Sequence, residues 1–256
     1  MTNDILVSQS NRVLRIQINR PDRKNALTGA MYDAMREALA RSSDDRDVRV
    51  VFIHGLPDCF TAGNDLAEFR DLDRMRRERP AMRFLETIST AIKPIVAAVN
   101  GPAVGIGTTL LLHCDLAYAG QSTRFQMPFA GLGLCPEGSS SYALARMAGH
   151  VRAAELLMLG ERFSADEAKS FGLVNAVLPD SELMAHAERK IAQLAAQPAG
   201  AIRATKALMR KWTSARVAEV LATESDAFGE RLASREFAEA AGAFFEKRKP
   251  DFSRFD

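Results

Sequence analysis

Residues 94–99, PIVAAV, run directly into residues 100–109, NGPAVGIGTT. The first stretch is short, apolar and rich in β-branched residues, which predicts a buried strand. The second is rich in glycine and leads into a helical pattern, so together they predict a strand, a tight turn and a helix. The turn is not a phosphate-binding P-loop, because no Gly-Lys-Ser/Thr follows. Its GxG is no full dinucleotide fingerprint, because position 110 is leucine.

The same order of strand, turn and helix occurs earlier in the chain. Residues 12–18 alternate apolar and polar side chains, as a half-buried strand does. Thr28 then caps a helical pattern with Met31 and Met35 on one side. Residues 48–53 form another β-branched run before a second glycine-containing turn. This recurrence predicts an α/β class with a layered core, although no stretch of sequence repeats at a fixed period.

The chain beyond Ser164 has a different, almost entirely helical pattern. Ser164 and Glu167 have capping-box spacing, Gly172 is placed to end that helix, and a last short strand follows. The remaining pattern consists of helices with breaks between them. We therefore predict two regions, a core of residues 1–195 and a C-terminal helical region of residues 196–256.

The composition bounds the class of protein. The 256 residues carry a net charge of +2 and are 47% hydrophobic, an ordinary globular mix that can bury a core. So small a charge favours no polyanionic partner. The three cysteines, Cys59, Cys114 and Cys135, have no CxxC spacing, and the four histidines stand apart. This predicts reduced thiols and no metal site.

The ends of the chain and its longest apolar run bear on location. The first residues are polar and acidic, without the basic and apolar regions of a secretory signal. The apolar run at residues 95–103 is too short to span a membrane. The last residues, SRFD, differ from the peroxisomal SKL signal. We expect a soluble cytoplasmic protein that contacts no membrane and no nucleic acid.

Three glycine-containing turns also carry groups that could take part in catalysis: FTAGNDL at 60–66, NGPAVGIGTT at 100–109 and GLGLCPEGSSS at 131–141. In the first two, a helix start leaves N–H groups unpaired, and these can stabilise an oxyanion. In the third, Glu137 lies among small and apolar neighbours, where burial would raise its pKa into a range useful for proton transfer. Each turn alone is also explained as an ordinary helix start or a glutamate favoured by the helix dipole. Together they supply what enolate chemistry needs, two N–H donors and one base.

Four motifs in the right order resemble the crotonase (enoyl-CoA hydratase/isomerase) family: NRPDRKNAL at 19–27, AGNDL at 62–66, AVNGPAVG at 98–105 and FEKRKP at 245–250. The resemblance implies a spiral core of repeated ββα units. It also implies a C-terminal helical trimerisation region, which builds trimers or dimers of trimers. The substrate would be an acyl-CoA thioester, with no metal or redox cofactor.

The same resemblance implies roles for individual residues. The backbone N–H groups of Asn64 and Ile106 would form the oxyanion hole. Lys24 and Ala26 would lie beside the adenine and pyrophosphate of coenzyme A, and a lysine of the FEKRKP motif would reach a phosphate of a neighbouring subunit's CoA. The other substrate-binding residues would come from the two oxyanion segments: Ala62, Gly63, Asp65, Leu66 and Gly105.

Acidic residues decide the reaction within this family. Hydratases resemble one another in carrying two glutamates, and the matching positions here are Thr109 and Phe129, which cannot transfer a proton at neutral pH. Glu137 instead lies where the peroxisomal-type Δ3,Δ2-enoyl-CoA isomerases carry their catalytic glutamate, and its flanks at 128–133 and 136–142 resemble theirs. The resemblance implies an isomerase in which Glu137 moves a proton from C2 to C4 of a 3-enoyl-CoA through a dienolate.

Other interpretations stay open at this point. The chain could be another crotonase-type CoA-ester enzyme, such as a hydratase, dehalogenase or ring-epoxide isomerase, or a catalytically silent scaffold. It could bind RNA through basic clusters, although such clusters are commonly solvated faces. The candidate clusters contain Arg74, Arg76, Arg77, Arg79, Arg203, Lys206, Arg210 and Lys211. Apolar residues near the turns could line an acyl pocket, although core packing is the simpler explanation for Phe60, Leu66, Phe129 and Leu134.

Overall fold

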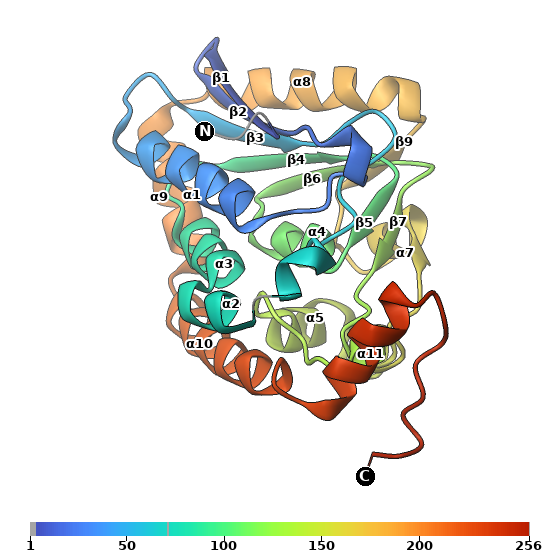
Figure 1. The fold of residues 1–256 in the computed structure, drawn as a ribbon. Helices are drawn as coiled ribbons and strands as arrows, with labels where there is room; N and C mark the ends of the chain where they lie inside the picture. The colour runs from blue at the N-terminus through green and yellow to red at the C-terminus, as the bar shows by residue number, and fades with distance from the viewer. Residues whose placement is uncertain (1–3, 71, 256) are drawn as a thin grey trace.

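A six-stranded sheet is the central feature of the computed structural model, which describes residues 4–70 and 72–255 (Figure 1). The strand order is β1-β2-β3-β4-β6-β9, with β1 antiparallel to β2 and the other pairs parallel. The predicted strands at 12–18, 48–53 and 94–99 are confirmed as β2, β3 and β4. The bounds are β1 (Ile5–Ser10), β2 (Val13–Ile18), β3 (Val50–His54), β4 (Ile95–Val99), β6 (Leu116–Gly120) and β9 (Ala176–Leu178).

A smaller sheet forms a second layer. Single parallel bridges, Leu27 with Asn64 and Thr61 with Ala103, extend this layer toward the earlier part of the chain. Each strand of the large sheet from β2 to β6 is thus followed by a short extended segment in the second layer and then by a helix. These are the ββα repeats of the predicted spiral, a repeat of geometry without a repeat of sequence. The strands of the small sheet are β5 (Pro102–Val104), β7 (Arg124–Gln126) and β8 (Phe163–Ser164).

Helices make up much of the remaining chain. Thr28 caps the first one as predicted, with its Oγ1 accepting from Met31 N at 3.4 Å, and Ser164 and Glu167 form the predicted capping box. The α-helices are α1 (Gly29–Asp44), α2 (Leu72–Glu78), α3 (Pro80–Thr90), α4 (Ile106–Thr109), α5 (Ser140–Ala148), α6 (His150–Ala154), α7 (Ala165–Ser170), α8 (Asp180–Ala196), α9 (Ala199–Arg210), α10 (Ser214–Arg231) and α11 (Arg235–Phe245). Short 3-10 or π turns are η1 (Pro21–Arg23), η2 (Leu66–Arg70), η3 (Leu110–His113), η4 (Ala130–Leu132) and η5 (Glu155–Leu159).

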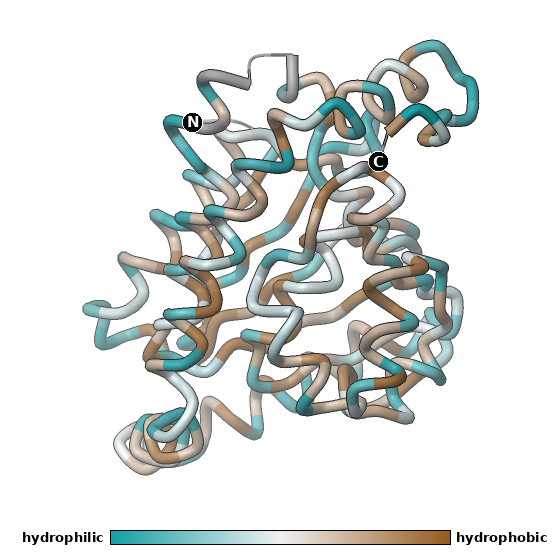
Figure 2. The backbone as a smooth tube through the Cα atoms, turned by 90° about the horizontal axis from the view of Figure 1, so that it is seen from below, coloured by the Kyte–Doolittle hydropathy of each residue, from teal (hydrophilic) through white to brown (hydrophobic). Residues whose placement is uncertain are grey.

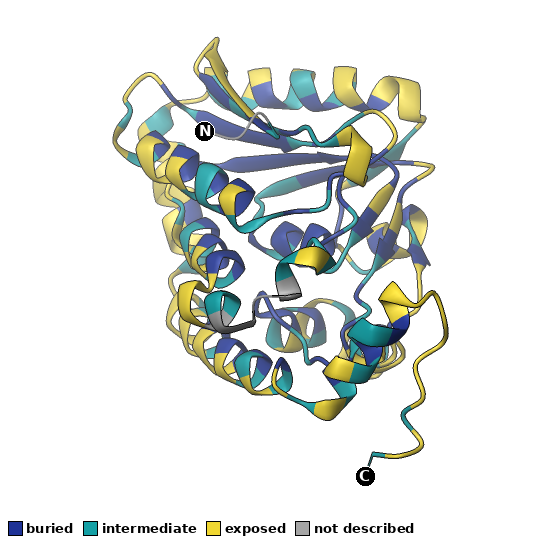
Figure 3. Ribbon diagram, in the orientation of Figure 1, coloured by how far each residue is buried: buried dark blue, intermediate teal, exposed yellow. Residues whose placement is uncertain are grey.

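Both faces of the large sheet are covered, which explains why β3 and β4 are apolar at nearly every position. Val50 and Phe52 of β3 join a hydrophobic cluster with residues of α8. Their neighbours Val51 and Ile53 point to the other face and join the main core with residues of α1 and α3. Figure 3 shows the strands buried between α8 and the helices on the opposite side.

The edge strand β1 was not predicted. Its residues, ILVSQS, are exposed after Ile5, so no alternation of apolar and polar side chains marks them as a strand. Pairing along the whole length of β2 holds this segment in place. Backbone pairing, and not burial of side chains, therefore accounts for β1.

The C-terminal helices return to the rest of the chain. α10 packs against α3 and α5, and α11 packs against η4. In Figure 2 the outer helices carry both hydrophobic and hydrophilic residues, as expected for elements with one buried side. The division into residues 1–195 and 196–256 stays a prediction. α8 does end at Ala196, but the helices after it are part of the same packed body.

Candidate active site

Two loops that are far apart in the sequence lie side by side. Ala62 N donates to Lys24 O at 3.0 Å, and Leu27 N donates to Gly63 O at 2.8 Å. Asp65 N donates to Leu27 O at 2.9 Å. The structure therefore brings the predicted CoA-binding motif into direct contact with the predicted first oxyanion segment.

Hydrogen bonds of the Asn25 side chain hold these loops together. Its side chain is fully buried, and its Nδ2 donates to the carbonyl oxygens of Ile18, Cys59 and Phe60 at 3.0–3.1 Å. Its Oδ1 accepts from Arg20 N at 2.7 Å. Asn25 has a left-handed φ of 55°, which asparagine tolerates better than most residues. Most other side chains here would leave buried carbonyl oxygens without a donor.

Asp65 and Leu66, predicted to bind substrate, make structural contacts. Asp65 Oδ2 accepts from Arg20 Nη1 at 2.7 Å, and its Oδ1 accepts from Ala67 N at 2.9 Å. The same guanidinium group donates to Ala26 O at 2.9 Å, so it joins both loops. Leu66 is partly buried against the core. Asp65 is thus paired with the guanidinium group of Arg20 and is not positioned to act as a second base.

The second glycine turn lies against the first. Val104 N donates to Thr61 O at 3.1 Å. A Cβ on Gly63 would stand 3.0 Å from Val104 O, and the φ of Gly63 is +90°, so this close approach requires glycine. Gly105 precedes α4 with φ 55° and ψ −117°, a conformation that residues with a side chain rarely adopt.

The N–H groups of Asn64 and Ile106 lie in these two turns. Neither donates to another group of the protein within the described residues. Ile106 is the first residue of α4, where N–H groups have no partner inside the helix. Both N–H groups are therefore available to a ligand oxygen, which is the property that the predicted oxyanion hole requires.

Glu137 lies in the third turn and is only 3% exposed. Thr109 Oγ1 donates to its Oε1, whereas nothing among the described residues hydrogen-bonds to its buried Oε2. Burial raises the pKa of Glu137 to about 8, the bond from Thr109 opposes this rise, and the nearby charge of Glu224 adds to it. The rise in pKa expected from the sequence is present, and burial is its main cause.

Tyr32 on α1 contacts the side chain of Asn64. Its hydroxyl group donates to Asn64 Oδ1. Burial raises the pKa of Tyr32 well above its ordinary value, and the charge of Glu137 adds to the rise, so the phenol stays a neutral donor. The Tyr32 contact was not predicted from the sequence. It orients the side chain of Asn64 within the same site as Glu137.

Asn64 and Glu137 meet in a pocket of about 330 Å³ between the α2–α3 segment and α10. One wall thus comes from the predicted C-terminal helical region, which was not expected. Ile106 is not among the described residues that line this pocket. Besides Asn64 and Glu137, the lining residues are Met75, Arg79, Pro80, Ala81, Met82, Ser225, Asp226, Phe228, Gly229, Glu230 and Leu232. The apolar residues considered as lining instead belong to the core or pack against it: Phe60, Leu66, Phe129 and Leu134.

The turn that carries Glu137 is held from two sides. Gly138 and Ser139 both have left-handed φ values, 70° and 57°. His113 Nε2 lies 3.0 Å from Gly138 O, and because a carbonyl only accepts, Nε2 carries the proton. Burial lowers the pKa of His113 to about 4, so this imidazole is neutral at physiological pH. From the other side, Glu224 of α10 accepts from Ser139 N at 2.6 Å.

Neither contact was predicted, although Glu224 has a signal in the sequence. Val217, Leu221, Glu224, Ser225 and Phe228 recur at helical spacing, and Glu224 is the acid on that otherwise apolar or small face. A carboxylate on a buried face needs a partner, because an unpaired buried charge is costly. The histidine at position 113 follows three leucines and has no comparable pattern.

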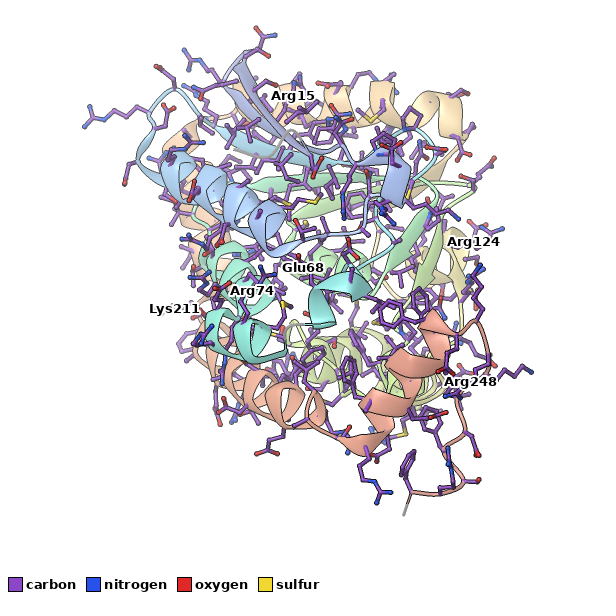
Figure 4. All side chains as sticks on the ribbon, viewed as in Figure 1. Arg15, Glu68, Arg74, Arg124, Lys211 and Arg248 are labelled. Carbon is purple, nitrogen blue, oxygen red and sulfur yellow. The ribbon has the colours of Figure 1, made fainter. Side chains whose placement is uncertain are left out.

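Basic residues considered for RNA binding are largely engaged within the chain. Lys206 is 6% exposed and donates to Asp115 Oδ2 at 2.7 Å. Arg74 Nη2 donates to Glu68 Oε2 at 2.6 Å (Figure 4). The side chain of Arg76 lies outside the described part of the structure. The interpretation of these clusters as solvated faces is therefore wrong for Lys206, whose ammonium group is buried and paired.

Known proteins identify the family to which this site belongs. A family model described as enoyl-CoA hydratase/isomerase matches residues 8–254. The chain belongs to this crotonase family. Enoyl-CoA delta isomerase 2 of Rattus norvegicus is 37% identical over 252 residues, covering 96% of this chain. The chain spans 64% of the length of that rat protein.

Relatives with another activity match as well. Short-chain-enoyl-CoA hydratase of Clostridium acetobutylicum is 31% identical over 254 residues, which cover 96% of both proteins. Family membership thus does not select between isomerisation and hydration. The acids of the site must make that distinction.

Solved structures confirm the predicted fold. The enoyl-CoA hydratase/isomerase from Pseudoalteromonas atlantica T6c superposes with a TM-score of 0.91 at 41% identity, covering 98% of this chain and 100% of that one. The OdaA protein of Pseudomonas aeruginosa has a TM-score of 0.91 at 44% identity, covering 95% of this chain and 99% of that one. The α/β crotonase fold expected from the motifs is therefore confirmed.

Two further observations concern the described residues as a whole. No helix in residues 4–70 and 72–255 has the length and apolar character needed to cross a membrane. Over the same residues, no three His, Cys, Asp or Glu side chains are grouped so that they could hold a metal ion.

Proposed function

We propose that the chain is a Δ3,Δ2-enoyl-CoA isomerase with Glu137 as its proton shuttle. The observation that carries the proposal is the state of this carboxyl group. It is buried, it lines the pocket beside Asn64, and its Oε2 has no partner among the described residues. A buried oxygen without a partner is costly, so its presence in a pocket suggests a functional use. Relatives named for isomerisation, such as the rat protein, support the same reaction.

The proposed substrate is a 3-enoyl-CoA bound by its thioester group. The thioester oxygen accepts from the N–H groups of Asn64 and Ile106, and each such donor is worth about 3–4 kcal/mol in the transition state. Lys24 and Ala26 contact the CoA adenine and pyrophosphate in this proposal, and the backbone from Ala62 to Leu66 lies beside the acyl group. The substrate's C2 then faces Oε2 of Glu137.

Proton transfer takes place in two steps. Ionised Glu137 first removes a proton from C2, and the electron pair of that C–H bond enters a dienolate whose negative charge rests on the thioester oxygen. The neutral acid then delivers the same proton to C4. The carbonyl group re-forms, the double bond lies between C2 and C3, and Glu137 returns to its starting state. One carboxyl group is therefore sufficient, and no cofactor takes part.

Hydration is the main alternative, and the residues around Glu137 argue against it. Adding water across a double bond needs a water molecule to be activated and a second proton to be placed. Thr109, at the first matching hydratase position, donates to Glu137, and Phe129, at the second, is buried in the core. The other acids among the described lining residues are Asp226 and Glu230 of α10, and Asp226 pairs with Arg79 Nη1 at 3.2 Å.

Several sequence predictions are kept as part of this proposal. We expect a cytoplasmic enzyme that forms homotrimers or dimers of trimers and uses no cofactor other than the CoA of its substrate. Lys247 and Lys249 are exposed after α11, and we expect one of them to contact a CoA phosphate of a neighbouring subunit.

A turnover assay with two substrates tests the reaction. Wild-type protein and Glu137→Gln are each given 3-hexenoyl-CoA and 2-hexenoyl-CoA, and products are separated by chromatography. We expect wild type to convert the 3-enoyl ester to the 2-enoyl ester, and kcat to fall by about a thousandfold or more in the variant, as for loss of a general base. Binding of a saturated acyl-CoA, measured by calorimetry, should change little.

A matched control is Glu219→Gln, which changes an exposed glutamate on α10 that pairs with Arg216. It should retain wild-type turnover. Hydration of 2-hexenoyl-CoA at a rate comparable with isomerisation would contradict the proposal, as would full activity of Glu137→Gln.

A further inference from the structure

Glu224 is a buried acid that reaches the Glu137 turn from the distant helix α10. It is 7% exposed, and its Oε2 accepts from Ser139 N at 2.6 Å. Its Oε1 accepts from Ser141 N at 2.9 Å and from Ser141 Oγ at 2.5 Å. Because backbone N–H groups only donate, Glu224 is bound as an acceptor, and the ionised carboxylate satisfies all three contacts.

The turn itself needs outside support. Gly138 and Ser139 are both left-handed, and for serine this conformation is disfavoured unless surrounding contacts maintain it. Glu137 O accepts from Ser140 N at 3.2 Å and from Ser140 Oγ at 2.6 Å, so the acid's own backbone is tied to the start of α5. A shift of residues 139–141 would therefore displace Glu137.

The position of Glu224 also matters for charge. A carboxylate at the start of α5 is favoured by the helix dipole, so Glu224 can remain ionised there. A negative charge so close to a second buried acid opposes ionisation of that acid. Among the described residues, the titratable or charged groups around Glu137 are Tyr32 on α1, Arg79 at the start of α3, His113 on η3, Cys135 in the turn, and Glu224, Asp226 and Glu230 on α10.

Most of these groups are neutral or already paired. Tyr32 and His113 are neutral at physiological pH, and Arg79 pairs with Asp226. The pKa of Glu137 is raised chiefly by burial and further by Glu224. Burial also raises the pKa of Glu224, while the bonds from Ser141 and Ser139 oppose that rise.

We propose that Glu224 is a positioning residue for the isomerase reaction, which holds the Glu137 turn in its left-handed conformation and places a negative charge near the proton-transferring acid. The inference rests on the proposed function, because it acts through the same Glu137. It gives α10 a place in the site beyond forming the pocket wall.

An infrared titration and an activity assay test this inference. Wild type, Glu224→Gln, Ser141→Ala and the exposed control Glu219→Gln are titrated by infrared spectroscopy, following the protonated carboxyl band that disappears in Glu137→Gln. The same proteins are assayed for conversion of 3-hexenoyl-CoA across the pH range. Thermal unfolding shows whether each variant is folded.

We expect Glu224→Gln to lower the midpoint of the Glu137 band by about half to one pH unit, because a like charge is removed. At a pH above both midpoints its kcat should fall about tenfold while KM changes little, because the base is less well placed but the substrate contacts remain. Ser141→Ala keeps the charge and loosens the contact, so its kcat should fall with an unchanged midpoint. Glu219→Gln should match wild type in both measurements.

Equal midpoints in folded Glu224→Gln and Glu219→Gln would overturn the role of charge. An unchanged kcat in Ser141→Ala would overturn the role in positioning, and this variant decides that question if Glu224→Gln does not fold. Absence of isomerisation in wild type would refute the proposed function alone, because the infrared midpoints still report the coupling of Glu224 to Glu137.

Discussion

Thr109 Oγ1 donates a hydrogen bond to Glu137 Oε1, and the other oxygen of the same carboxyl group has no partner among the described residues. The contact engages one carboxyl oxygen and leaves the other available to a ligand. From the sequence, Thr109 was only a position at which hydratases carry a catalytic glutamate, and the structure adds its hydrogen bond to Glu137. Thr109 cannot transfer a proton at neutral pH, but its hydroxyl group orients the carboxyl group of Glu137, which can.

Replacing Thr109 with valine tests this relationship. The hydroxyl bond lowers the pKa of Glu137 against the effect of burial, so its loss should raise the pKa further above about 8. We expect the midpoint of the pH profile of kcat/KM to move up by about one unit, with kcat/KM at pH 7 about tenfold lower. An unchanged midpoint in a folded variant would show that the bond does not govern ionisation.

The pH dependence of wild type follows from the raised pKa. The proposed base must be ionised in the free enzyme, so kcat/KM should rise with pH and level off above a midpoint near 8. Initial rates at low substrate concentration, from pH 5.5 to 9.5, measure this profile. A plateau reached already near pH 5 would mean that Glu137 is not the limiting base.

Folding stability should respond to the same group with a defined sign. The pKa of Glu137 rises from 4.5 to about 8 on folding, so its contribution to stability is fully present below pH 4.5 and is lost as pH rises through 8. The free energy of unfolding of wild type, minus that of Glu137→Gln, should therefore fall across this window. Urea unfolding of both proteins at pH 5, 7 and 9 tests it, and a difference that is constant with pH would contradict it.

Gly138 provides a test of the turn's geometry. Its φ is +70°, and an added Cβ would stand 2.9 Å from Thr109 Cβ. We expect Gly138→Ala to lose about 1–3 kcal/mol of stability and much of its activity, because the backbone is strained and Thr109 is displaced. Gly131→Ala in the preceding loop is the control, since its Cβ would meet nothing within 4 Å. Equal denaturation midpoints for the two variants would count against this description of the turn.

Local patterns predicted several elements of the fold. The β-branched runs at 48–53 and 94–99, the Thr28 cap and the Ser164 capping box depend on neighbouring residues, and each is confirmed. The edge strand β1 escaped prediction because backbone pairing with β2, and not burial, holds it. The glycine turns were found because their backbone conformations exclude side chains.

The sequence alone determined the family, the two glycine turns and Glu137, because each depends on residue type, order and local backbone preference. Only the tertiary structure decided what surrounds that acid. Thr109 orients it, Tyr32 is joined to Asn64, Glu224 supports its turn, and α10 closes a pocket for which core residues had been considered. These contacts join residues separated by 28 to 85 positions, and burial among the packed elements raises the pKa of Glu137 to about 8. Such burial depends on how the helices pack, which no local pattern records.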